Sequence, residues 1–353
     1  HPSCMLFATK PKGVFIEFTD HSRRVMRANS HKAPMVIEAF AECEVDDDEG
    51  WDQIVEHFLP KNAPNGLLQA SCGVYPVKRL VRQAEIDARK VKDDGYINDF
   101  ASSQFRIDPA KYALSLINAH DGSDYQVDKA TENNVIFAGM PHESIAEVQD
   151  NLIEQNVYPE RLEIGTLSCL GALVDYLRFS KIKQPVVVLE LDLDIAYSFI
   201  VSDEGLLASR LLPQGLKSMI PVVQKELGLK DEESARKLFF SNTFDFTGMG
   251  SKLVARLINE LQSSIGFFEV QTGQSIGNVV CPNLSSKLGW LEGVIVTQMG
   301  VAPIEMNLKP WLESRGVTFS ADTADMEITR EWLGVLSLMP RYDAVQTEQK
   351  EAE

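Results

Sequence analysis

The sequence contains the same succession of predicted elements twice, about 170 residues apart. Each copy consists of three short strands, separated by polar turns, and one helix. The expected segments are Val14–Phe18, Arg23–Ala28, Met35–Ala41 and Trp51–Leu59 in the first copy, and Val186–Leu191, Ile195–Val201, Leu206–Leu212 and Leu216–Leu227 in the second. Self-similarity of this kind predicts an internal duplication, with one α/β unit in each half.

A different α/β pattern separates the two copies. We expect an amphipathic helix over Val77–Lys92, with Leu80, Val81 and Ala84 on its apolar side, and a second helix over Glu143–Asn156. The strands predicted between these helices are Gln104–Ile107, Tyr125–Asp128 and Val135–Met140. These segments predict a small inserted α/β subdomain, after which the chain re-enters the first half through a helix over Leu167–Leu177.

These patterns predict four parts of the chain. The first half comprises residues 13–70 and 160–183, the inserted subdomain residues 71–159, and the second half residues 184–340. The clearest helix, Lys252–Phe268, lies in the second half and carries an apolar stripe typical of a core helix. Residues 341–353 are polar and acidic, which predicts a disordered tail.

Charge and motif content exclude several classes of function. The chain of 353 residues has 34 basic and 51 acidic residues, and its net charge of −17 opposes binding to nucleic acid or to an anionic membrane surface. Its five scattered cysteines indicate a reducing compartment, and no apolar run is long enough for a membrane helix. The histidines lack metal-ligand spacing and no GxSxG motif occurs. We therefore predict a cytoplasmic protein without a metal site or catalytic residues.

The order of these parts resembles one known family. Together with the run Leu206–Leu216 and the following Leu227-Gly228-Leu229, it is similar to the PilM-type proteins of type IV pilus assembly, relatives of the division protein FtsA in the actin-like superfamily. The resemblance extends from about Gly13 to Pro310. It implies two actin-like (ribonuclease H-like) halves around a cleft, with a small α/β subdomain inserted. The cytoplasmic domain of GspL-type secretion proteins is the alternative.

Actin-like ATPases hold the phosphates of ATP in two hairpin turns of the form Asp-Ile-Gly, here called the phosphate turns. Glycine matters there because a backbone without Cβ can approach the phosphates and present its N–H groups. In the first turn Glu17 keeps the acid, but Thr19 stands in place of the glycine. In the second, Asp192 and Ser198 stand for the Asp and Thr of the family, whereas Asp194 replaces the glycine.

The residues expected to bind the adenosine of ATP also differ from those of the family. The Gly-Gly turn of the family appears as Pro282-Asn283, and an Ala-Glu pair appears as Ala235-Arg236. The resemblance also implies Gly215 as a residue of the nucleotide site. A carboxylate near a phosphate is repelled by about 1 kcal/mol in water and by more in a closed cleft. The resemblance therefore implies a degenerate nucleotide site without a cofactor; the alternative is an ATPase that binds ATP and magnesium.

The resemblance also implies a function and a partner. PilM-type proteins bind the N-terminal cytoplasmic tail of a bitopic PilN-type membrane protein, in a groove between the first half and the inserted subdomain. Here the groove would be lined around Val77–Lys92, Gln104–Ile107 and Val135–Met140. Basic side chains in the first of these segments could meet an acidic partner or form a solvated face; they are Lys78, Arg79, Arg82, Arg89, Lys90 and Lys92. We expect a cytoplasmic scaffold at the inner membrane, held there through its partner.

Overall fold

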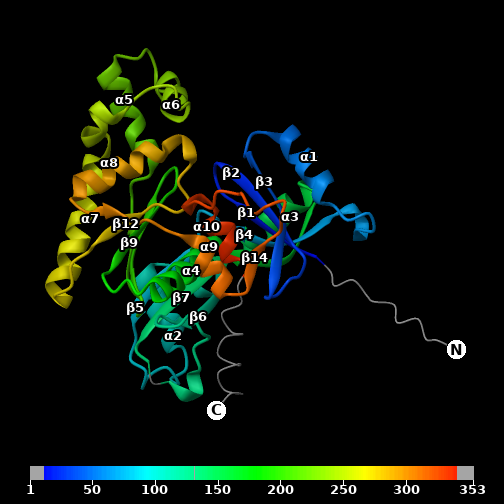
Figure 1. The fold of residues 1–353 in the computed structure, drawn as a ribbon. Coiled ribbons are helices and arrows are strands. Elements are labelled where there is room, and N and C mark those ends of the chain that lie inside the picture. Colours follow the sequence, from blue (N-terminus) through cyan, green and yellow to red (C-terminus); the bar gives the residue numbers. More distant parts are fainter. Residues whose placement is uncertain (1–11, 131, 340–353) are drawn as a thin grey trace. The chain divides into compact units, whose positions relative to one another are not determined.

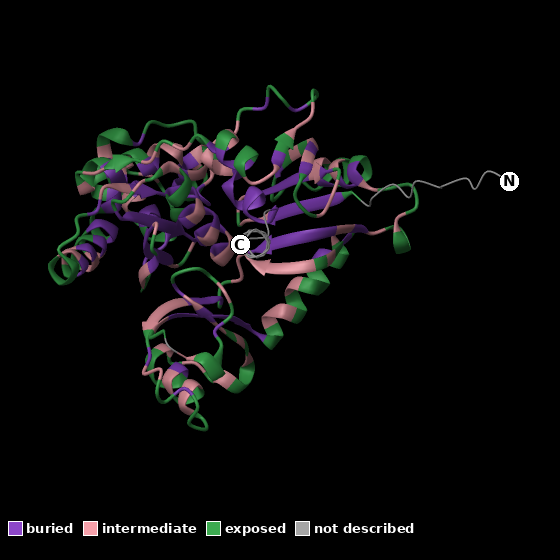
Figure 2. Ribbon diagram, turned by 60° about the horizontal axis from the view of Figure 1, so that its bottom comes forward, coloured by how far each residue is buried: buried purple, intermediate pink, exposed green. Residues whose placement is uncertain are grey.

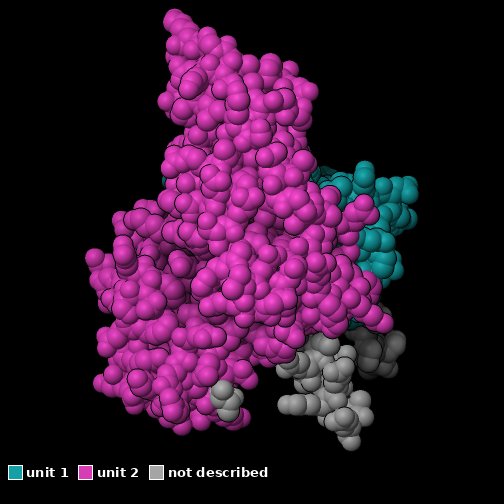
Figure 3. Space-filling view, turned by 90° about the vertical axis from the view of Figure 1, so that its left-hand side faces the viewer, with its two compact units in different colours: residues 1–74, 149–163, 307–353 teal, residues 75–148, 164–306 magenta. Residues whose placement is uncertain are grey.

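The computed structural model describes residues 12–130 and 132–339, so the predicted tail at 341–353 lies outside the described residues. The chain forms two compact units (Figure 3). The first unit contains residues 1–74, 149–163 and 307–353, and the second contains residues 75–148 and 164–306. In Figure 2 the strands of the larger sheets are mostly buried, whereas the loops and the outer faces of the helices are exposed.

A six-stranded sheet in the order β14-β3-β2-β1-β4-β8 forms the centre of the first unit (Figure 1). Its strands are β1 (Gly13–Phe18), β2 (Ser22–Ala28), β3 (Met35–Glu44), β4 (Leu68–Val74), β8 (Val157–Ile164) and β14 (Val317–Phe319). β1, β2 and β3 form an antiparallel meander, and β4 runs parallel to β1. Helices α1 (Asp48–Phe58), α9 (Leu308–Ser314) and α10 (Leu333–Ser337) complete the unit. α1 begins where the Asp47 side chain accepts a hydrogen bond from the Gly50 N–H at 2.9 Å.

The second unit repeats this topology in a five-stranded sheet of order β11-β10-β9-β12-β13. Its strands are β9 (Val186–Leu191), β10 (Ala196–Ser202), β11 (Gly205–Leu212), β12 (Asn278–Val280) and β13 (Ala302–Pro303). β9, β10 and β11 form the antiparallel meander, and β12 runs parallel to β9, as β4 does to β1. The predicted duplication is therefore confirmed strand by strand.

Helices enclose the five-stranded sheet on both faces. They are α4 (Gly165–Ser180), α5 (Ile220–Leu227), α6 (Glu232–Phe240), α7 (Gly250–Thr272) and α8 (Gly289–Met299). The last four gather on one face (Figure 1), where Leu189, Ile200 and Leu212 pack against their apolar residues. α4 packs against β10 and β11. α5 ends at Gly228 in the left-handed conformation (φ 61°), where the sequence predicted a helix end.

The inserted segment forms a three-stranded sheet in the order β5-β7-β6, with β5 (Leu80–Glu85), β6 (Tyr112–Asn118) and β7 (Asn134–Pro141). α2 (Tyr96–Phe105) covers one face through an aromatic cluster in which Phe100 stacks on Phe137. α3 (His142–Glu154) leads out of the insert. The insert is bonded to the five-stranded sheet, because the Gln83 N–H donates to Ser209 Oγ at 2.8 Å and the Leu206 N–H to the Ala119 carbonyl at 2.9 Å.

Within the insert, three expectations were wrong. The predicted helix Val77–Lys92 is mostly the strand β5 and a following turn, because its backbone pairs with β7 from Leu80 to Glu85. Gln104–Ile107 is the end of α2 and a left-handed Arg106, not a strand. Tyr125–Asp128 is not a strand, and its last two residues begin a short 3₁₀ turn over Val127–Lys129. The neighbouring strand β6 was not predicted. The strand at Val135–Met140 and the helix at Glu143–Asn156 are confirmed.

The predicted division into parts also differs from the structure. The second half was expected to reach residue 340, but residues 307–339 belong to the first unit, because β14 pairs with β3. α4 was assigned to the first half and lies in the second unit. The insert was expected from residue 71, whereas β4 runs to Val74 beside β1. No helix among residues 12–130 and 132–339 is both long and apolar enough to span a bilayer.

Candidate functional site

Most of the predicted nucleotide residues of the second unit meet at one edge of its five-stranded sheet. Asp192 follows β9, Gly215 follows β11, and Pro282-Asn283 follow β12. Because β9 and β11 are both antiparallel to β10, and β12 is parallel to β9, the carboxyl ends of these three strands share an edge. The structure thus brings together residues that are up to 91 positions apart in the sequence, from Asp192 to Asn283.

The side chain of Arg79, from the start of the insert, fills the position beside Asp192. Its guanidinium lies against the Asp192 carboxylate, with Nη1 2.8 Å from Oδ2 and Nη2 3.3 Å from Oδ1. Nη2 also donates to Glu190 Oε2 at 3.0 Å, and Nε donates to Thr166 Oγ1 at 2.8 Å. We call Arg79, Thr166, Glu190 and Asp192 the Arg79 cluster. It combines β9, α4 and the segment before β5 in one buried network.

The hydrogen-bonding capacity of Arg79 is used up within the protein. Nη1 also donates to the carbonyls of Pro76 at 3.2 Å and of Tyr75 at 3.4 Å, so every nitrogen of the guanidinium has a partner. The arginine side chain is fully buried and Glu190 is nearly so. Burial alone would lower the pKa of Arg79, but the charges of Glu190 and Asp192 outweigh it and raise that pKa. Arg79 is therefore a permanent cation held between two carboxylates.

Two tyrosine rings, those of Tyr75 and Tyr197, pack against the Arg79 guanidinium. The Tyr197 ring lies under the guanidinium, with 4.2 Å between the arginine Cζ and the ring centroid, and its hydroxyl donates to the Val77 carbonyl at 3.1 Å. Burial raises the pKa of Tyr197 to about 12. Tyr75 packs so tightly on Gly165 that a Cβ there would lie 2.4 Å from the tyrosine Cζ. The cluster is thus sealed by residues of the same unit.

The second phosphate turn is closed by the backbone that follows β11. The N–H groups of Leu216 and Lys217 donate to the carbonyls of Asp192 and Leu193, each at 2.9 Å. Gly215 permits this approach, because a Cβ there would lie 2.4 Å from the Leu193 carbonyl oxygen. Asp194, exposed in the turn, binds the Lys217 ammonium at 2.9 Å. N–H groups of the kind that hold phosphates are therefore already occupied.

Three other predicted residues of this unit, Ser198, Pro282 and Asn283, are not part of the Arg79 cluster. Ser198 pairs with Leu189 in the β9–β10 register, and Glu190 pairs with Tyr197, so Ser198 faces the opposite side of the sheet from Glu190. Pro282 and Asn283 are buried after β12. Just before them, the Cys281 N–H donates to the buried Glu292 carboxylate at 2.7 Å. The backbone N–H that follows β12 is thus hydrogen-bonded to a carboxylate of α8.

The first phosphate turn is closed by the residue that replaced its glycine. Thr19 Oγ1 accepts hydrogen bonds from the N–H groups of Ser22 at 2.9 Å and His21 at 3.2 Å, and its hydroxyl donates to the Ser22 carbonyl at 3.1 Å. The threonine side chain therefore takes the backbone donors of the β1–β2 turn.

Glu17 is buried beneath the C-terminal part of the first unit. Its side chain is 3% exposed and lies 3.6 Å from Arg24 Nη1, in a salt bridge. α10 crosses directly above it, because a Cβ on Gly334 would lie 1.6 Å from Glu17 Oε1. The residues after α10 also contact β4, because a Cβ on Gly73 would lie 3.1 Å from Leu338 Cδ2. The carboxylate that the resemblance assigned to the first phosphate turn is therefore covered by the same unit.

The sequence pattern missed three members of the Arg79 cluster: Arg79, Thr166 and Glu190. One signal was present, since Glu190 and Asp192 interrupt a run of apolar residues and a buried pair of acids requires a cation. The pattern did not indicate which cation, because Arg79 lies 111 residues before Glu190. The sequence analysis instead interpreted Arg79 as one of several basic residues on a predicted helix.

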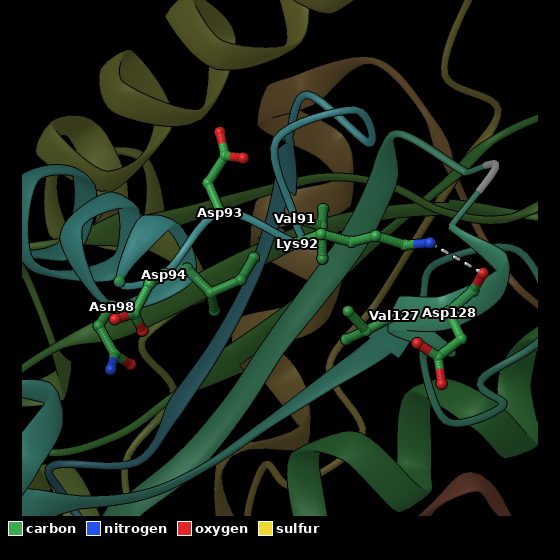
Figure 4. Close-up of a pocket in the computed structure, with 9 residues that line it drawn as sticks. Val91, Lys92, Asp93, Asp94, Asn98, Val127 and Asp128 are labelled. Atoms are coloured by element: carbon green, nitrogen blue, oxygen red, sulfur yellow. Dashed lines mark hydrogen bonds between the residues drawn. The ribbon is translucent and has the colours of Figure 1, made fainter.

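A separate cavity of about 450 Å³ lies in the insert (Figure 4). Its apolar lining includes Val91, Ile97 and Val127, and its carboxylates are those of Asp93, Asp94 and Asp128. Lys92 reaches across it and donates to the Asp128 carbonyl at 3.4 Å. With three acids against one lysine, the cavity repels phosphate groups and does not offer a second nucleotide site.

No family model matches the sequence, and no curated protein matches it either. The two repeated sheets and the insert define an actin-like α/β fold. Among solved structures, the PilM–PilN type IV pilus biogenesis complex is similar, with a TM-score of 0.64 at 16% identity over 93% of this chain and 97% of that chain. The resemblance to PilM-type proteins is therefore confirmed for the fold.

Two further structures are similar at lower scores. The ethanolamine utilization protein EutJ from Carboxydothermus hydrogenoformans has a TM-score of 0.44 at 12% identity, over 93% of this chain and 89% of that chain. A Bacteroides thetaiotaomicron protein with an actin-like ATPase fold and unknown function has a TM-score of 0.43 at 11% identity, over 87% and 95%.

Proposed function

We propose that this protein is a cytoplasmic scaffold of a type IV pilus platform, or of a related secretion platform, at the inner membrane. In this proposal it binds the N-terminal cytoplasmic tail of a PilN-type membrane protein and has lost nucleotide turnover. It reaches the membrane surface through that partner. The support is of two kinds: a fold shared with a protein solved as a PilM–PilN complex, and the state of the phosphate turns.

The Arg79 cluster is the observation on which the loss of turnover rests. An ATPase of this fold needs the carboxylate at position 192 to face a hydrated metal and the phosphates. Here the Asp192 carboxylate is paired with the guanidinium of Arg79, and every nitrogen of that guanidinium has a hydrogen-bond partner within the protein. ATP would have to displace a buried ion pair, and separating such a pair costs about 3–5 kcal/mol.

The first phosphate turn supports the same proposal independently. Thr19 takes the backbone donors, and Glu17 lies under α10. These changes use different residues in a different unit, so one altered position does not explain both. Each half of the duplicated fold has exchanged its phosphate contacts for internal ones, which favours a role in binding protein rather than nucleotide.

Two titrations of the full chain test the proposal. Calorimetry with ATP and magnesium is expected to give no saturable heat at millimolar nucleotide, and micromolar binding would refute the degenerate site. Biolayer interferometry with an immobilised N-terminal tail of the PilN-type protein is expected to give saturable binding, with a scrambled tail as the control. Equal binding of both tails would refute the scaffold role.

A further inference from the structure

Arg82, three residues after Arg79, has an unusual position in the insert. It lies on β5 between Leu80 and Ala84 on the same face of the strand, and opposite Phe137 of β7. Leu80 and Phe137 are buried in the cluster of apolar residues under α2. The alternation of β5 therefore directs a charged side chain toward an apolar layer.

The guanidinium of Arg82 lacks the partners that Arg79 has. Its Cζ lies 5.4 Å from the centroid of the Phe105 ring, and its Nε is buried without a hydrogen bond in the described structure. Among residues 12–130 and 132–339, Arg82 takes part in no ion pair. Burial lowers the pKa of Arg82, opposed only by Tyr197, whereas the pKa of Arg79 is raised by its carboxylates. A charge that has lost water without gaining an anion is a costly arrangement.

We propose that Arg82 is the anchor for a carboxylate of a bound ligand, namely an acidic side chain in the extended tail of the partner protein. This inference rests on the proposed function and specifies the chemistry of the partner. The arginine side chain as a whole is only partly buried, so its end can be reached from solvent. A carboxylate fits the planar fork of a guanidinium with two parallel hydrogen bonds.

The surroundings favour a carboxylate on a peptide over a phosphate. Phe105, whose ring lies 5.4 Å from the Arg82 Cζ, and Tyr112 are partly buried hydrophobic residues packed against the same apolar cluster. Such surfaces bind the apolar parts of a peptide chain. A phosphate carries up to two charges and meets the repulsion of a protein with a net charge of −17, whereas a single carboxylate is repelled less.

A side-chain NMR titration of the full chain tests the pairing directly. The signal followed is Nε–Hε of Arg82, assigned with the Arg82→Lys variant, and the probes are capped glutamate, capped glutamine and inorganic phosphate. We expect capped glutamate to shift this signal saturably and capped glutamine to leave it unchanged. Arg89, which is 90% exposed and paired with Asp87, serves as the internal control. Equal shifts with both amino acids, no shift, or a larger shift with phosphate would overturn the proposal.

A second measurement separates this inference from the proposed function. The tail of the PilN-type partner is titrated into wild-type protein and into Arg82→Gln, with its acidic residues either intact or replaced by their amides. We expect Arg82→Gln to weaken the intact tail about tenfold and to leave the amide tail unaffected. If the tail binds equally to both proteins, the anchor is wrong while the scaffold stands. If no tail binds but capped glutamate still shifts Arg82, the scaffold is wrong while the carboxylate site stands.

Discussion

The guanidinium of Arg79 and the carboxylate of Asp192 form a bidentate pair, with nitrogen–oxygen distances of 2.8 and 3.3 Å, although 113 residues separate them in the chain. Asp192 is the residue that an actin-like ATPase would direct toward its nucleotide. In this protein the insert supplies a permanent counter-ion to it. The pair therefore joins the first segment of the insert to the end of β9.

Removing the cation of the Arg79 cluster is expected to destabilise the second unit strongly. Arg79→Met leaves Glu190 and Asp192 buried without a counter-charge, and we expect the free energy of unfolding to fall by about 3–5 kcal/mol. Urea unfolding followed by tryptophan fluorescence measures the change. Arg89→Met, at an exposed ion pair of the same insert, is the matched control and should change little. Equal effects of the two substitutions would show that the Arg79 cluster is not a major source of stability.

Neutralising Glu190 tests the charge balance of the same cluster through pH. Burial raises the pKa of Glu190 above its ordinary value of 4.5, and the ion pair with Arg79 offsets this only partly. A carboxyl with a raised pKa in the folded state stabilises the fold at low pH and loses that contribution as the pH rises through the raised value. We expect the stability of wild-type protein to fall relative to Glu190→Gln as the pH rises above 4.5. Unfolding curves across this range check it, and a flat or opposite trend would contradict it.

Thr19 offers a test of the first phosphate turn. Thr19→Val keeps the shape but removes the oxygen that accepts hydrogen bonds from the N–H groups of His21 and Ser22. We expect a loss of about 1–3 kcal/mol, because these donors lose their partner. Thr19→Ser keeps the oxygen and should retain most of the stability. Similar losses in both variants would mean that the methyl group, and not the hydrogen bonds, matters at this position.

The packing of α10 over Glu17 predicts a steric effect at Gly334. A Cβ at this position would overlap Glu17 Oε1, so Gly334→Ala is expected to cost about 1–3 kcal/mol or more in the free energy of unfolding. Gly266→Ala in α7 is the control, because a Cβ at this position would meet no neighbouring atom within 4 Å. Alanine is also more favourable than glycine within a helix by about 1 kcal/mol. The two variants should therefore change stability in opposite directions. A neutral Gly334→Ala would mean that α10 does not cover Glu17.

The duplicated fold could be predicted from the sequence because its signals are local. Buried strands such as Val186–Leu191 can be recognised from the hydrophobic pattern of a few neighbouring residues. These strands and the polar turns between them occur twice in the same order. The sequence does not indicate that the Thr19 hydroxyl accepts the hydrogen bonds of the β1–β2 turn. Local patterns thus predicted the duplicated strands.

The insert shows where local patterns fail. Leu80, Val81 and Ala84 follow helical spacing, but the pairing with β7 makes this segment the strand β5. That pairing joins residues 49 to 59 positions apart, from Glu85–Asn134 to Leu80–Gly139, so no short window of sequence contains it. The placement of β14 beside β3 was missed for the same reason.

By itself the sequence determined the repeated strands and the end of α5 at Gly228. Only the tertiary structure decided which cation neutralises the acids buried at the end of β9, which carbonyls occupy the donors after Gly215, and which helix covers Glu17. The physical reason is that burial creates a demand for a counter-charge or a hydrogen bond, which a sequence displays. The partner that meets this demand comes from a distant segment, and only the packed chain brings it within about 3 Å.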